Sequence, residues 1–420
     1  MFWFILAFYL FFCVLYRKNK VLLTLFILQV ISVLCAIIIN LDSYSDDSKT
    51  FYNVAYILVS TLMLILPWKK YGEMTVLLEE DRRRVDTLTN VLLVISSFTF
   101  IVLAIVAVVA QIYIGNAYIN DFKDETTHFY YNMLPFDVHW YLLARILYTF
   151  SYFLIPLHFY HLFVGNKTKS NWCAVLSLNI VLYGLAFFSR WTIMLFVCLY
   201  LVMWFIFRKV MPEREAKREK KAIVIIFASL LLIFSAITLG RFASDDGVST
   251  RYSERIPMES PIQDPATYSI LDYMGQSNSI GIYLLNKYQG QHFGFKYPLM
   301  SIQTLLAGIG LSGPSDVYEL HEKHWGSMWD KFPGFTVYGV YDVGYVLAFF
   351  FCVVYFLIVY KRRTTFRLHN LLTAVVLIQM PICSIYYSQA SAVLYSLLFY
   401  LPIWLFLNGG NTKGKRSRAR

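Results

Sequence analysis

The chain has 420 residues, of which 58% are hydrophobic and only 15% are charged, and its formal net charge is +11. About a quarter of the residues in a soluble domain are charged, so this composition excludes an ordinary soluble globular protein. The positive charge lies in short clusters between apolar segments, such as RKNK at 17–20 and DRRR at 81–84. We interpret these clusters as signals that orient a membrane protein, and not as sites for RNA or anionic lipid.

Apolar segments predict eleven membrane-spanning helices, because a helix needs about 20 apolar residues to cross a bilayer. The first segment has no basic start and no cleavage site, so we expect a retained span instead of a signal peptide. The stretch 171–207 is too long for one span, and we place a turn at Ser189 and Arg190. The predicted spans are 1–16, 21–40, 51–68, 88–114, 139–164, 171–189, 190–207, 222–240, 336–360, 370–388 and 390–407.

This arrangement places the N-terminus outside and the C-terminus in the cytoplasm. It puts 26 of the 37 lysines and arginines inside and 18 of the 26 acidic residues outside, in agreement with the positive-inside rule. We therefore expect an all-α polytopic integral membrane protein. Its predicted parts are a bundle of eight spans (1–240), one large extracytoplasmic loop (241–335), and three spans with a basic tail (336–420). In the loop, 266–288 is predicted to be helical, and 297–313 is either an interfacial or re-entrant helix or a helix facing the core of the loop.

Five arginines are predicted to gather at the outer membrane surface. Arg251 and Arg255 lie one helical turn apart in the loop, and Arg145 lies about 9 Å below the outer end of its span. Guanidinium groups are always charged and bind phosphate oxygens in pairs, which favours a lipid diphosphate as their ligand. Alternatively, some of them only reach the interface or pair with nearby acidic residues. The five candidates are Arg145, Arg190, Arg241, Arg251 and Arg255.

Asp342 is the main carboxylate within the predicted spans. Ion-coupled transporters keep ionisable residues at the bilayer midplane, so this scarcity counts against an exporter. His321 and His324 in LHEKHW do not match the H-E-x-x-H zinc motif, and we expect no metal and no cofactor. Arginines that stabilise a leaving diphosphate and a carboxylate or histidine base suffice for glycosyl transfer. Aromatic residues such as Tyr273 could stack on the sugars.

Three stretches carry a resemblance to a known family: FFSRWTIMLF (187–196), LDYMGQSNSIGIYL (271–284) and FTVYGVYDVGYVLAFFF (335–351). In the last, Tyr341, Asp342 and Gly344 read Y-D-x-G, which is similar to the family's Y-x-D-x-G pattern but lacks the residue between Tyr and Asp. With the large outer loop, the three stretches resemble the Wzy-type repeat-unit polymerases of bacterial O-antigens and capsules. The resemblance implies a GT-C-like fold and a metal-independent membrane glycosyltransferase. Such an enzyme polymerises oligosaccharides linked to undecaprenyl diphosphate on the periplasmic face of the inner membrane.

The resemblance also implies roles for individual residues. Arg190, Arg241, Arg251 and Arg255 would hold the diphosphates, and Asp342, His321 or His324 would act as the base or bind sugar, with Tyr341 as a further sugar-binding candidate. The partners would be the lipid-linked oligosaccharide and the bilayer, without nucleic acid; a chain-length regulator and a flippase stay open as further partners. The alternatives are a surface-glycan ligase, which an Arg and His in the outer loop would suit, and a lipid-linked glycan exporter.

Overall fold

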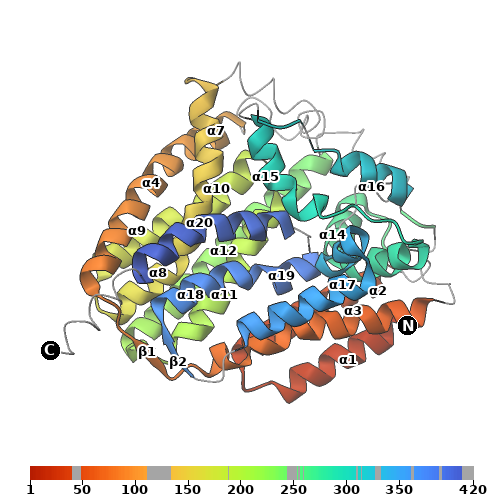
Figure 1. Cartoon of the computed structure of the whole chain (residues 1–420), viewed down its shortest axis with the longest axis horizontal. Helices are drawn as coiled ribbons and strands as arrows, with labels where there is room; N and C mark the ends of the chain where they lie inside the picture. Colours follow the sequence, from red (N-terminus) through yellow and green to blue (C-terminus); the bar gives the residue numbers. More distant parts are fainter. Residues whose placement is uncertain are drawn as a thin grey trace. The chain divides into compact units, whose positions relative to one another are not determined.

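A computed structural model describes most of the chain (Figure 1). Its described residues are predominantly helical, which confirms the predicted helical architecture. In this part of the chain, five helices are long and apolar enough to cross a membrane: Lys20–Ile38, Thr50–Glu73, Arg82–Val109, Val138–Phe163 and Phe335–Val359. The described residues are 1–39, 49–110, 134–187, 189–243, 253, 256–258, 260–308, 311–313, 315–326, 333–360, 364–386 and 390–408.

The chain divides into two compact units. Unit 1 combines Met1–Glu73, Arg251–Arg363 and Leu377–Tyr395, and unit 2 combines Met74–Thr250, Thr364–Val376 and Ser396–Arg420. Most of the segment predicted as the large loop is therefore compact with the N-terminal helices. The described elements of unit 1 are α1 (Phe2–Leu15), α2 (Lys20–Ile38), α3 (Thr50–Ile65), the 3₁₀ helix η2 (Leu66–Glu73), α14 (Pro265–Lys287), α15 (Lys296–Gly308), α16 (Val317–Trp325), α17 (Phe335–Val359) and α19 (Gln379–Tyr386).

Helix α14, which the sequence analysis predicted at 266–288, packs tightly against the C-terminal end of α2. A Cβ atom on Gly275 would lie only 2.6 Å from the backbone nitrogen of Ala36, so the two backbones approach this closely only because Gly275 has no side chain. The C-terminal end of α14 meets the start of α3, where Asn286 Nδ2 donates a hydrogen bond to Thr50 Oγ1 (2.8 Å). Helix α14 thus contacts the ends of α2 and α3 that the chain connects through 39–49.

Polar side chains, most of them uncharged, hold α14 inside unit 1. Ser277 Oγ lies 3.2 Å from Ser32 Oγ of α2. Asn53 Nδ2 of α3 donates to Asn286 Oδ1 (2.7 Å), and Asn53 Oδ1 accepts from the hydroxyl of Tyr345 in α17 (2.7 Å). These side chains are buried or half-buried, and each hydrogen bond offsets the cost of removing the polar groups from water. The network ties α3, α14 and α17 to one another.

Unit 2 contains two short strands that the sequence analysis did not predict. β1 (Val76–Leu78) pairs in parallel with β2 (Thr365–Arg367), and the central pair, Leu77 and Phe366, is buried. Both strands lie in segments predicted as cytoplasmic loops. The other described elements, some of whose terminal residues belong to unit 1, are α4 (Arg82–Val109), α7 (Val138–Leu147), the 3₁₀ helix η4 (Tyr148–Phe150), α8 (Ser151–Phe163), α9 (Lys167–Ser177), α10 (Asn179–Ala186), α11 (Arg190–Phe207), α12 (Glu213–Ala243), α18 (Leu368–Leu377) and α20 (Ala390–Asn408).

The predicted turn at Ser189 and Arg190 is present. Helix α11 begins at Arg190, and Ser189 adopts an extended backbone conformation as its N-cap. A Cβ atom on Gly184 would lie 2.4 Å from Thr192 Oγ1, so this glycine allows α10 and α11 to form a tight hairpin. The predicted span 171–189 consists of two shorter helices, α9 and α10, with Leu178 between them.

Candidate functional site

Helix α17 is broken at Gly344, the last residue of the stretch YDVG (341–344). Gly344 has φ 80° and ψ 165°, a backbone conformation that is essentially restricted to glycine. A Cβ atom on Gly339 would lie 3.3 Å from the Cβ of Ala348, whereas residues nine apart in a straight helix are separated by about 13 Å. The chain therefore reverses direction at Gly344, and residues 335–343 fold back against 345–359.

The break frees two backbone carbonyl groups, which bind the loop before α15. Phe293 N donates to the carbonyl of Tyr341 (2.9 Å), and Gly294 N donates to the carbonyl of Asp342 (3.0 Å). The Asp342 carboxylate accepts a hydrogen bond from Tyr297 N (3.2 Å), in the first turn of α15. A carboxylate in this position satisfies a free N–H group and interacts favourably with the helix dipole. Asp342, which is only 3% exposed, thus fixes α15 to the break.

Six aromatic side chains pack together between this loop, α16 and α17. The rings of His321 and Trp325 stack with a centroid separation of 3.9 Å, and those of Tyr297 and Tyr338 stack at 4.0 Å. His321 is buried, and this burial lowers its pKa to about 4, so its imidazole is neutral near pH 7. We call this group the aromatic cluster; its members are Phe293, Tyr297, His321, Trp325, Tyr338 and Tyr341.

His324 lies at the edge of the aromatic cluster. Its ring centroid is 5.8 Å from that of Phe293, and its side chain is half-buried. Partial burial lowers the pKa of His324, and the neighbouring Lys323 lowers it further. A neutral imidazole that solvent can reach is able to accept a proton from a hydroxyl group. Of the two histidines predicted from LHEKHW, His324 is the more accessible and His321 is part of the packed cluster.

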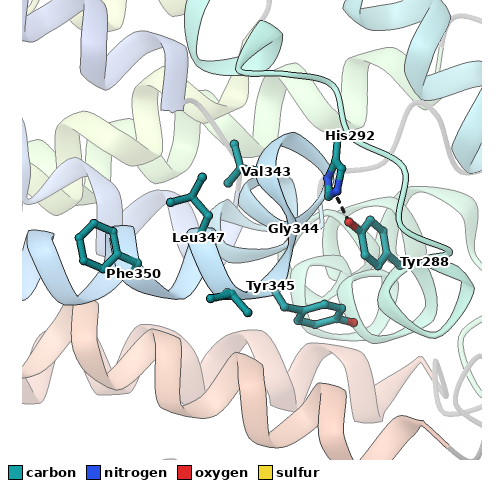
Figure 2. Close-up of a pocket in the computed structure, with 8 residues that line it drawn as sticks. Tyr288, His292, Val343, Gly344, Tyr345, Leu347 and Phe350 are labelled. Carbon is teal, nitrogen blue, oxygen red and sulfur yellow. Dashed lines mark hydrogen bonds between the residues drawn. The ribbon is translucent and has the colours of Figure 1, made fainter.

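An open pocket of about 520 Å³ lies beside the break. Figure 2 shows Tyr288 and His292 facing each other across a hydrogen bond, with Tyr288 Oη 3.2 Å from His292 Nδ1. The Tyr288 ring also contacts Tyr341 of the aromatic cluster, at a centroid distance of 5.2 Å. The pocket therefore has a polar end next to the cluster and an apolar side along α17. The remaining lining residues are Val343, Gly344, Tyr345, Val346, Leu347 and Phe350.

The sequence analysis did not single out the loop before α15, residues 288–295. Three of its side chains, those of Tyr288, His292 and Phe293, line the pocket or the aromatic cluster. The available signal was the pair Gly290 and Gly294, which both adopt positive φ angles (90° and 66°) and shape the loop. Such glycines mark a tightly turning segment, although they do not reveal what the segment contacts.

The predicted sugar-binding residue Tyr273 lies away from the aromatic cluster. It is half-buried in α14, eleven residues before Leu284, whose carbonyl accepts a hydrogen bond from the Tyr341 hydroxyl (2.9 Å). Eleven residues correspond to about 16 Å along a helix. The structure thus brings Tyr341, Asp342 and His321 together, with His324 at the edge, and does not bring Tyr273 to them.

In unit 2, Arg145 lies among aromatic rings. Its guanidinium carbon is 5.4 Å from the ring centroid of Phe187, and it shares a hydrogen bond with Tyr183. The structure gives Arg145 no ion pair with any acidic residue that it describes. Phe187 precedes Arg190 by three residues, and for Arg190, as for Arg241, only the backbone is described. Two other predicted phosphate ligands, Arg251 and Arg255, lie outside the described residues.

Among the described residues, no three His, Cys, Asp or Glu side chains lie close enough together to hold a metal ion. The chemistry available near the break therefore comes from aromatic faces, a half-buried imidazole and an engaged carboxylate. Comparison with protein-family models, with curated proteins and with solved structures found no match.

Proposed function

We propose that the protein is a repeat-unit polymerase, which joins oligosaccharides linked to a lipid diphosphate into a surface polysaccharide. The observation that carries this proposal is the aromatic cluster at the broken helix, with His324 at its edge and the pocket of Tyr288 and His292 beside it. Flat aromatic faces suit sugar rings, and the apolar side of the pocket suits a lipid chain. A single site with both properties fits a substrate that is half sugar and half lipid.

In the proposed reaction, His324 accepts the proton of a sugar hydroxyl on the incoming repeat unit. The hydroxyl oxygen forms a bond to the anomeric carbon of the growing chain, and the bond from that carbon to the diphosphate oxygen breaks. Undecaprenyl diphosphate leaves with the bonding electrons. Arginines stabilise such a leaving group, which is the role that the sequence predicts for Arg251 and Arg255. Asp342 positions the α15 loop instead of taking the proton.

The proposal includes eleven spans in a GT-C-like arrangement in the bacterial inner membrane, with the N-terminus outside and the site on the periplasmic face. The division of charge between the predicted sides supports this orientation. The contacts of α14 also support it, because Gly275 in its middle and Asn286 near its C-terminus meet the ends of α2 and α3 that are predicted to face outward. A chain-length regulator and a flippase are the protein partners to test.

Deletion of the gene in its own host, followed by electrophoresis of the surface glycans, tests the proposal. We expect the ladder of repeats to collapse to a lipid-core band with one repeat. Complete loss of surface repeats, with full-length polymer left on its lipid carrier, would instead indicate a ligase, and an unchanged ladder would refute both functions. His324→Asn should fail to restore the ladder, whereas His139→Asn, at a histidine with a side chain 84% exposed, should restore it.

A further inference from the structure

A second pocket, of about 480 Å³, lies at the N-terminal end of α4 in unit 2. Arg84 is held in place there, because its Nη1 donates to the carbonyl of Phe406 (3.1 Å) and its Nε lies 3.6 Å from Asp81 Oδ2. The neighbouring Arg83 is exposed and has no ion pair with a described acidic residue. The pocket therefore contains one fixed and one unpaired guanidinium group. Its lining residues are Arg83, Arg84, Thr87, Leu405 and Phe406.

The face of α4 that begins at this pocket changes from polar to apolar along the helix. Arg84 and Thr87 are followed at helical spacing by Val91, Val94 and Ile101, so all five lie along one face. The three apolar side chains are 52%, 72% and 61% exposed. Helix α4 is long and apolar enough to cross a membrane. A cationic turn followed by an exposed apolar face is complementary to a phospholipid, which has a phosphate above its acyl chains.

We propose that this pocket binds an anionic phospholipid, with its phosphate on Arg83 and Arg84 and its acyl chains along Val91 and Val94. The guanidinium fork matches phosphate oxygens geometrically. The sequence analysis interpreted DRRR at 81–84 as an orientation signal and not as a lipid site. An orientation signal needs charge alone, whereas a pocket with a fixed arginine favours selective lipid binding, and the structure therefore changes that interpretation. No residue of the proposed glycosyl-transfer site takes part, so either proposal can fail without the other.

The test measures binding of phosphatidylglycerol to the full-length protein in zwitterionic detergent micelles, by native mass spectrometry and by the rise in melting temperature. Arg83→Gln/Arg84→Gln should bind about 30-fold more weakly, since each basic residue at an anionic lipid surface contributes roughly fivefold to tenfold. The matched control is Arg17→Gln/Lys18→Gln, which removes two exposed charges from another predicted cytoplasmic loop. It should change the affinity by less than about twofold.

Two further measurements distinguish a phospholipid site from a site for free phosphate and from unselective lipid binding. Glycerol 3-phosphate and inorganic phosphate are added alone; if either displaces the lipid at equal concentration, the site binds free phosphate and the lipid proposal is overturned. Equal binding of phosphatidylcholine, or equal losses in the double variant and its control, would also overturn it. If the double variant fails to fold, Arg83→Gln alone decides, because Arg83 has no described side-chain partner to lose, and about fivefold weaker binding is expected.

Discussion

Replacing Gly344 with alanine should destabilise unit 1, because α17 is broken there. The backbone conformation of Gly344 costs a residue with a Cβ about 1–3 kcal/mol. The added Cβ would also lie 2.9 Å from Cε1 of His292, but this side chain is exposed and its far end can move away, so the contact adds little. The expected loss is therefore roughly 1–3 kcal/mol. In a continuous helix the same substitution would stabilise the protein by up to about 1 kcal/mol, so the sign of the effect tests the break.

Thermal unfolding can be followed with a thiol-reactive dye, since five of the six cysteines are buried and would react only on unfolding. Gly290→Ala is the matched control, because Gly290 has φ 90° but nothing within 4 Å of an added Cβ. Its melting temperature should fall only because alanine disfavours the positive φ angle. Combining Gly344→Ala with His292→Ala should leave the loss nearly unchanged, because the backbone conformation causes most of it. A melting temperature for Gly344→Ala that equals or exceeds that of the unmodified protein would refute the broken helix.

Substitutions at three other residues test the site and its support. The pKa of His321 is lowered to about 4, so its contribution to stability is complete above pH 6.5 and is lost as the pH falls toward 4, by up to about 3 kcal/mol. His321→Phe should remove this contribution to the pH dependence of the melting temperature. Asp342→Asn keeps an acceptor for Tyr297 N and should keep the glycan ladder, whereas Asp342→Ala removes the acceptor and should lower the free energy of unfolding by about 1–3 kcal/mol. Loss of the ladder in a well-folded Asp342→Asn variant would instead indicate that Asp342 is the base. Gly275→Ala should lower the melting temperature because the backbone of α2 cannot give way, and an unchanged value would contradict the close approach.

Local patterns were sufficient to predict many of the helices but few of their contacts. The start of α11 at Arg190 and the helix at Pro265–Lys287 follow from hydrophobic runs and turn residues in neighbouring sequence. The pairing of β1 with β2 joins residues almost 290 positions apart, and three-residue strands carry no periodic signal. Hydropathy also treats 336–360 as one continuous helix, because it cannot detect that Gly344 interrupts the helix within an apolar run.

The candidate site was predictable only in part, for a similar reason. Asp342 and Tyr341 belong to a recognisable pattern, and His321 belongs to a conspicuous histidine pair. The loop that completes the site, with His292 and Phe293, is polar and glycine-rich and has no motif of its own. Its place is set by backbone hydrogen bonds to carbonyl groups that exist only because α17 is broken. In an intact helix these carbonyl groups would be bonded within the helix, so the sequence alone does not predict where the loop binds.

The break in α17 is held from both sides, which bears on how the site works. Before Gly344, the carbonyls of Tyr341 and Asp342 bind the 293–294 backbone. Immediately after it, the Tyr345 hydroxyl donates to Asn53 of α3. An irregular backbone in a membrane protein is tolerated only where its polar groups find partners within the protein, and here the carbonyls of Tyr341 and Asp342 are paired. The aromatic cluster is thus positioned before any substrate arrives, and substrate binding does not have to supply the free energy that orders it.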